Sequence, residues 1–149
     1  MNTHTSNLTK ILALDLGDQW VGSALSDNMR LLARPYKTVA ASQLEEFLSS
    51  TLQAEPIGIV VVGYPITLKG KESEQTRKVE TLYQALVQKF PDREFVKWDE
   101  RLSSQRAATL TTRKTKEEKL HSHSVAAAFI LDSYLSYLAY QKTLSEDCC

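Results

Sequence analysis

The chain has 149 residues, which suits one domain over 1–149, and its 18 Lys and Arg residues balance 18 Asp and Glu residues. Because the formal net charge is zero, overall charge cannot hold nucleic acid, and any such binding needs a local basic patch. Its two cysteines, Cys148 and Cys149, are adjacent and cannot build a disulfide framework. No apolar run is long enough to span a membrane. We therefore expect a cytoplasmic protein with no membrane contact.

The first third of the chain predicts three strands. Residues 1–9 are polar and are expected to form a flexible tail. An apolar run over 11–14 that ends at Asp15 predicts a buried strand, and 20–26 predicts a second strand that forms a hairpin with it. A third extended stretch over 31–39 contains Pro35, which favours the edge of a sheet.

A helix and a central strand follow. Ser42 is expected to cap a helix over 43–53 that has apolar residues on one face. The segment Ile57–Gly63 is β-branched and apolar on both faces, a pattern typical of a central parallel strand that helices cover on both sides.

The rest of the chain predicts three more helices and one more strand. In chain order these are a loop over 66–72, a helix over 73–90, a strand over 94–98, a short helix over 104–112, a mobile charged loop over 113–121, a last helix over 122–141 and a flexible tail over 142–149. A hairpin start excludes the all-parallel Rossmann arrangement. The order predicts an α/β domain with a mixed five-stranded sheet, three antiparallel strands first and then parallel strands, with helices on both faces.

Two acids stand at the ends of predicted strands, Asp15 after the first and Glu100 after the last. Ligand sites form at the carboxyl edge of parallel strands, and two carboxylates that converge there repel each other unless a cation lies between them. Mg²⁺ or Mn²⁺ suits such oxygen ligands and can activate water for phosphodiester cleavage. Gly17 and Gly22 would let a phosphate backbone approach the hairpin closely. The alternative is that both acids are solvated or capping residues.

Four segments, in this order, resemble motifs of the YqgF-type family and together span about 11–138. They are Leu14-Asp15-Leu16-Gly17 with Val21-Gly22 and Ser26-Asp27, Val61-Val62-Gly63-Tyr64-Pro65-Ile66 with Gly70, Asp99-Glu100-Arg101-Leu102-Ser103, and Ser124-Val125-Ala126-Ala127 with Ile130-Leu131 and Tyr134-Leu135. The resemblance implies an RNase H-like fold. It also implies a metal-dependent nuclease that processes the 5′ end of the precursor of 16S ribosomal RNA, in ribosome biogenesis. The family is also described as a Holliday junction resolvase acting on branched DNA.

The resemblance implies that Asp15 and Glu100 hold the Mg²⁺ or Mn²⁺ ion. The family's third acid opens the last helix, and the alignment places His123 there. Three interpretations stay open: His123 is a metal ligand and catalytic residue, it is a bystander in a site that has lost activity, or the alignment is slipped and His121 lies nearer the metal. Asp132 cannot substitute, because nine residues along a helix it faces the opposite side.

A histidine in place of an acid changes the expected metal preference. We expect a helix N-terminus to keep the His123 ring neutral, which suits coordination. A pocket that contains two carboxylates and a neutral ring should bind Mg²⁺ more weakly and prefer Mn²⁺. If the site has lost activity, the protein is a nucleic-acid-binding module.

Four basic residues are candidate contacts to structured RNA, such as the ribosomal precursor, or to branched DNA. They are Lys69, Lys71, Arg101 and Arg106. Arg101 is the strongest candidate for a phosphate contact, because the fork of N–H groups on its guanidinium fits an anion. The alternative is that Arg101 forms an ion pair with Asp99. Trp20 either stacks on a base or packs on the protein. We expect a monomer or weak homodimer; a resolvase, which cuts two strands, would need a stable symmetric dimer.

Overall fold

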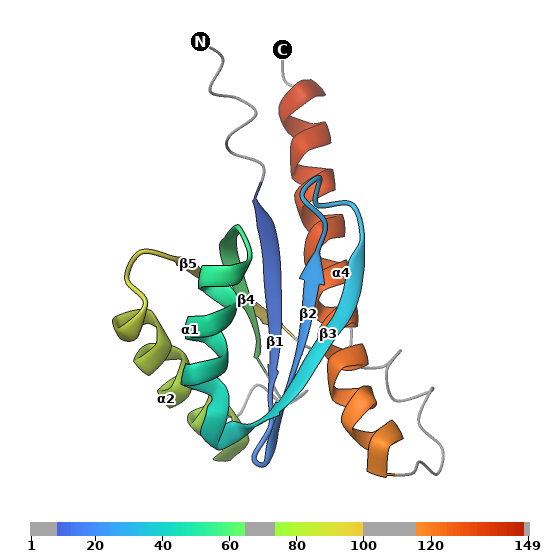
Figure 1. The fold of residues 1–149 in the computed structure, drawn as a ribbon. Helices are drawn as coiled ribbons and strands as arrows, with labels where there is room; N and C mark the ends of the chain where they lie inside the picture. The colour runs from blue at the N-terminus through green and yellow to red at the C-terminus, as the bar shows by residue number, and fades with distance from the viewer. Residues whose placement is uncertain (1–8, 65–73, 100–115, 148–149) are drawn as a thin grey trace.

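The computed structural model describes residues 9–64, 74–99 and 116–147, which form a mixed sheet with helices on both faces (Figure 1). The elements are β1 (Lys10–Leu16), β2 (Trp20–Ser26), β3 (Ala33–Ala40), α1 (Leu44–Ala54), β4 (Ile57–Tyr64), α2 (Glu74–Lys89), β5 (Glu94–Asp99) and α4 (Lys116–Asp147). The strand order is β3-β2-β1-β4-β5. β3, β2 and β1 are antiparallel neighbours, whereas β1, β4 and β5 run parallel. The predicted fold class is confirmed.

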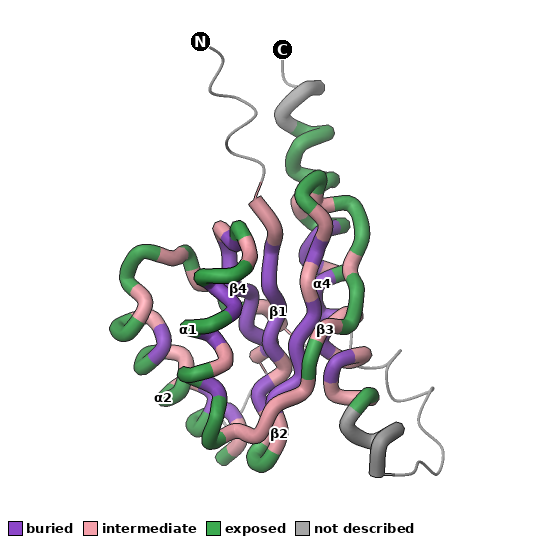
Figure 2. The backbone as a smooth tube through the Cα atoms, in the orientation of Figure 1, coloured by how far each residue is buried: buried purple, intermediate pink, exposed green. Residues whose placement is uncertain are grey.

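Alternating side chains of the central strands build two separate cores. Leu12, Leu14 and Leu16 of β1 pack with residues of α1 and α2 on one face. Ile11 and Ala13, between them, pack with α4 on the other face. β4 divides its side chains between the same two cores, and β1, β2 and β4 are the most continuously buried strands (Figure 2). The sheet is therefore the middle layer of three.

Most predicted boundaries agree with the structure to within one or two residues, and Pro35 lies in the edge strand β3 as expected. The prediction that Ser42 caps α1 is wrong. A short 3₁₀ turn, Ala41–Gln43, precedes the helix, and Gln43 at the cap position makes no side-chain capping bond.

The last helix is longer at both ends than the sequence predicts. α4 begins at Lys116 inside the expected mobile loop and continues to Asp147 through the expected tail. The polar segments at its two ends lack the apolar stripe from which the helix was predicted, so its ends were missed. The predicted loop over 66–72 and the helix over 104–112 lie outside the described residues.

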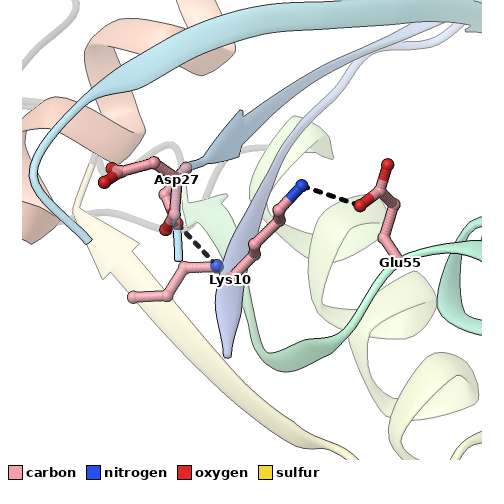
Figure 3. Close-up of polar contacts among 5 residues, drawn as sticks. Lys10, Asp27 and Glu55 are labelled. Atoms are coloured by element: carbon pink, nitrogen blue, oxygen red, sulfur yellow. Dashed lines mark hydrogen bonds and ion pairs between the residues drawn. The ribbon is translucent and has the colours of Figure 1, made fainter. Parts of the chain in front are cut away.

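The N-terminal ends of the parallel strands are held by polar contacts (Figure 3). Lys10 Nζ lies 2.8 Å from Glu55 Oε2, which ties β1 to the segment before β4. In the β2–β3 turn, the Asp27 carboxylate accepts hydrogen bonds from the backbone N–H groups of Met29, Leu31 and Leu32 at 2.8–3.2 Å. These bonds fix the end of the sheet that is opposite Asp15. No helix in the described ranges has the length and apolar character needed to cross a membrane.

Candidate active site

Asp15 is the penultimate residue of β1 and is half-buried. It follows Ile11 and Ala13 on alternate positions, and both of those residues pack in the core under α4. Because side chains alternate along a strand, the Asp15 carboxylate lies on the α4 face of the sheet. The sequence therefore placed this acid correctly near a strand end, and the structure adds which face it occupies.

Gly22 of β2 is the partner of Asp15 in the antiparallel ladder, on the same face. A Cβ atom built on Gly22 would overlap the carbonyl group of His123 and would lie 2.8 Å from the backbone nitrogen of Ser124. The glycine therefore admits the α4 backbone. This differs from the expectation that Gly22 leaves room for a phosphate backbone, because the helix already fills the space above it.

His123 lies on the sheet-facing side of α4. It precedes Ala127, Ile130 and Tyr134 at intervals of four, three and four residues, and those three are buried against the sheet. His123 itself is half-buried, whereas His121 and Asp132 are exposed. His123, rather than His121 or Asp132, therefore lies on the side of α4 that packs against the Asp15 face of the sheet.

The helix begins seven residues before His123, about two turns away. The expectation that His123 stands at the N-terminus of its helix is therefore wrong, and the influence of a helix end fades within the first turn.

Gly17 and Trp20 close the β1–β2 turn beside the site. The Gly17 N–H donates to the Trp20 carbonyl at 3.0 Å, and a Cβ on Gly17 would lie 2.6 Å from that same oxygen. Gly17 is thus required by the tight turn. Trp20 is half-buried at the start of β2, on the same face as Gly22 by strand alternation.

On the other side of Asp15, β4 and β5 continue the sheet. Leu14 pairs with Val62 and Gly63 pairs with Trp98, so Gly63 is the next position beside Asp15 and Trp98 lies beyond it. The Trp98 indole N–H donates to Ser133 Oγ at 3.1 Å, and its ring meets the Tyr134 ring edge-on at 5.2 Å. α4 therefore rests on β5 as well as on β2.

Glu100 follows β5 directly but lies outside the described residues, so its approach to Asp15 stays a prediction. Asp99, before it, is half-buried and pairs with Tyr64. Within the described ranges, no three His, Cys, Asp or Glu side chains gather in a metal-binding group. The expected ligand set includes Glu100 and is not tested by that finding. Lys69, Lys71, Arg101 and Arg106 also lie outside the described residues.

Sequence analysis did not predict a cluster around Lys97 on the opposite face of β5. Lys97 Nζ lies 2.6 Å from Glu80 Oε2 of α2 and stands over the rings of Tyr64 and Tyr83 at 5.3 and 4.9 Å. The hydrogen bond from Lys97 is the main cause that lowers the pKa of Glu80, and the same bond raises the pKa of Lys97. The cluster joins α2 to the ends of β4 and β5. Its signal in the sequence was a lysine between the apolar residues Val96 and Trp98.

Comparisons with known proteins agree on family and fold. A family model described as "RuvX: Holliday junction resolvase" matches residues 9–137. A protein of Rubrobacter xylanophilus named "putative pre-16S rRNA nuclease" is 38% identical over 127 residues, 85% of this chain and 91% of that protein. One of the same name from Chlorobaculum tepidum is 35% identical over 136 residues, 88% of this chain and 96% of that protein.

The structural comparison supports the fold alone. The structure of T. thermophilus RuvC in complex with a Holliday junction substrate aligns with a TM-score of 0.57 and 16% identity. The alignment covers 87% of this chain and 94% of that one.

Proposed function

We propose that this chain, which belongs to the RuvX (YqgF) family, is a metal-dependent nuclease that cleaves the precursor of 16S ribosomal RNA near its 5′ end. The observation that carries the proposal is the similarity, over more than four fifths of the chain, to relatives named for that activity. The position of Asp15 supports it, since the carboxylate stands at the carboxyl edge of parallel strands, where ligands bind in open α/β sheets.

We propose that Asp15, Glu100 and His123 hold an Mg²⁺ or Mn²⁺ ion. The positions of two of the three donors support this, because Asp15 is half-buried on the α4 face and His123 stands on the side of α4 that packs on that face. Hard cations take carboxylate oxygens, and an imidazole nitrogen shifts the preference towards Mn²⁺. When bound, the metal would supply an activated water and stabilise charge on the scissile phosphate. The protein's part is to fix the carboxylate and the ring, through the contact of α4 with Gly22.

For substrate binding we propose phosphate contacts from Lys69, Lys71, Arg101 and Arg106. Because the formal net charge is zero, overall charge cannot hold the strand, and binding requires such a local basic patch. Arg101 directly follows Glu100, so its guanidinium would meet the phosphate next to the acid.

A second candidate function is resolution of four-way DNA junctions. The family model's own description favours it. A resolvase must cut two strands in one complex and therefore needs two sites related by symmetry. A stable dimer would support this function, whereas a monomer or weak homodimer fits the RNA nuclease.

One experiment distinguishes the two candidate functions. The purified protein is incubated with a pre-16S RNA fragment and with a four-way DNA junction, each with Mg²⁺ and with Mn²⁺, and its mass in solution is measured alongside. We expect cleavage of the RNA by a monomer or weak dimer, stronger with Mn²⁺. Symmetric cleavage of the junction by a stable dimer would replace the first function with the second. Salt-sensitive binding without cleavage in either metal would mean that the fold is kept as a binding module.

A further inference from the structure

A cavity of about 580 Å³ opens on the face of the sheet opposite α4, at the end where β1 finishes. Its apolar walls come from β1, β2, the turn before α1, and both helices of that face: Leu16, Val21, Ala41, Leu44, Val79 and Leu82. A volume of this size is typical of sites for small organic groups. No aromatic side chain of the described residues lines it.

The rim of the cavity carries charge. Arg77 and Lys78 of α2 stand on it, together with Glu74 and with Asp18 of the β1–β2 turn. Lys78 Nζ lies 3.4 Å from Asp18 Oδ1, and both side chains are more than half exposed. Because an exposed ion pair contributes little stability, Lys78 can exchange Asp18 for a phosphate at small cost. The rim thus carries two cations and two acids beside an apolar interior.

The cavity is close to Asp15 along the chain and in space. Leu16 and Gly17, which line it, are the two residues that follow Asp15. Two residues of extended strand span about 7 Å. The Asp15 carboxylate faces α4 and the Leu16 side chain faces the cavity, so the two sites lie on either side of one strand end.

We propose that this cavity receives one unpaired base of the substrate strand, close to the phosphate that is cleaved. The inference rests on the proposed function. Proteins that bind single strands bury the flat faces of unstacked bases while the phosphates stay at cationic groups. The apolar walls suit the base, and Arg77 and Lys78 suit the phosphates on either side of it. Because no aromatic ring of the described residues lines the cavity, burial rather than ring stacking holds the base, and selectivity among the four bases is weak.

The test measures binding without cleavage. The Asp15→Asn protein is titrated with RNA strands that lack a single base, with the abasic position moved along the strand. We expect one position at which the missing base weakens binding about tenfold. Leu82→Trp in the same background fills the cavity and should remove this difference. Leu32→Trp is the matched control, since it alters an exposed leucine at the opposite end of the sheet and should preserve the difference.

A scan in which every position binds alike overturns the proposal, and so does a base effect that Leu82→Trp leaves intact. Failure of the proposed function gives a different result from failure of this proposal. In that case the natural protein does not cleave the RNA, whereas the binding scan can still be measured. Absence of binding to every strand contradicts the proposal as well.

Discussion

Gly22 of β2 lies directly against the backbone of His123 in α4, and the same glycine faces Asp15 across the ladder between β1 and β2. A side chain on Gly22 would meet backbone atoms, which cannot rotate aside as the end of a flexible side chain can. This contact therefore limits how far the helix turn that carries the imidazole stands from β2, the strand beside the one that carries the carboxylate.

Gly22→Ala is expected to push α4 away from β2 and to destabilise the protein by about 1–3 kcal/mol, the usual cost of overpacking. Cleavage should fall further than the loss of folded protein explains, because His123 moves relative to Asp15. Gly58→Ala is the control: its Cβ would meet the Thr9 side chain near the N-terminal end of β4. Urea unfolding and cleavage rates measured at a temperature where both variants are folded check the prediction. Full cleavage by a folded Gly22→Ala protein would contradict it.

The Asp27 turn predicts a pH dependence of stability. Hydrogen bonds from backbone N–H groups, that of Leu32 foremost, lower the pKa of Asp27 from its ordinary value of 3.8. A carboxyl group whose pKa is lower in the folded state stabilises the protein above its unfolded pKa, and this contribution disappears as the pH falls through the folded pKa. Asp27→Ala should therefore cost stability at pH 7, and the deficit should shrink below about pH 4.

Urea midpoints of the natural protein and of Asp27→Ala, taken from pH 2.5 to 7, measure this deficit. Asp92→Ala, at an exposed position after α2, is the control and should show a smaller deficit at pH 7. A deficit for Asp27→Ala that stays constant over the whole range would mean that the carboxylate does not hold the turn.

The ion pair of Lys97 and Glu80 is expected to stabilise the fold slightly over a wide range of pH. The pKa of Glu80 is lowered and that of Lys97 is raised, so the pair stabilises the fold between roughly pH 4.5 and 10.5. Both side chains are about one third exposed, so Lys97→Met should cost no more than about 1 kcal/mol near pH 7. Thermal unfolding at pH 3 and pH 7 measures the cost, which should be smaller at pH 3. Lys97→Arg should retain most of the stability; a loss equal to that of Lys97→Met would contradict the ion pair.

His123→Asp is expected to raise cleavage with Mg²⁺ several-fold and to reduce the advantage of Mn²⁺, because a third carboxylate favours a hard cation. His121→Asp introduces the same charge at an exposed position two residues away and should leave the metal preference unchanged. Cleavage rates over a range of concentrations of each metal give the answer. Equal effects of the two substitutions would show that bulk charge is responsible and that His123 is no ligand.

The parts of the fold that local pattern determines were predictable. The β-branched run of β4, the apolar run that ends at Asp15, and Pro35 in the edge strand each carry their signal in neighbouring residues. The face on which Asp15 lies was not predictable, because β1 is apolar on both faces and only the packing of α4 distinguishes them.

Features that depend on distant segments were missed. The role of Gly22 needs the α4 backbone, which is about a hundred residues further along the chain. The first residues of α4 are a run of charged residues. This pattern is typical of a loop, but in the structure the helix extends through it. Lys97 and Glu80 belong to a strand and a helix that meet only in the folded sheet.

The central proposal is that the Asp15 carboxylate, on the α4 face, helps to hold the metal ion on which cleavage depends. The most direct test is the single-turnover cleavage rate of a pre-16S RNA fragment by Asp15→Asn, in saturating Mn²⁺, beside Asp132→Asn as a control at an exposed position on α4. We predict that Asp15→Asn binds the RNA with little change but loses at least about a hundredfold in rate, because the metal that Asp15 would hold is the group that stabilises developing charge, whereas Asp132→Asn cleaves normally. An Asp15→Asn protein that cleaves at the natural rate would contradict the account.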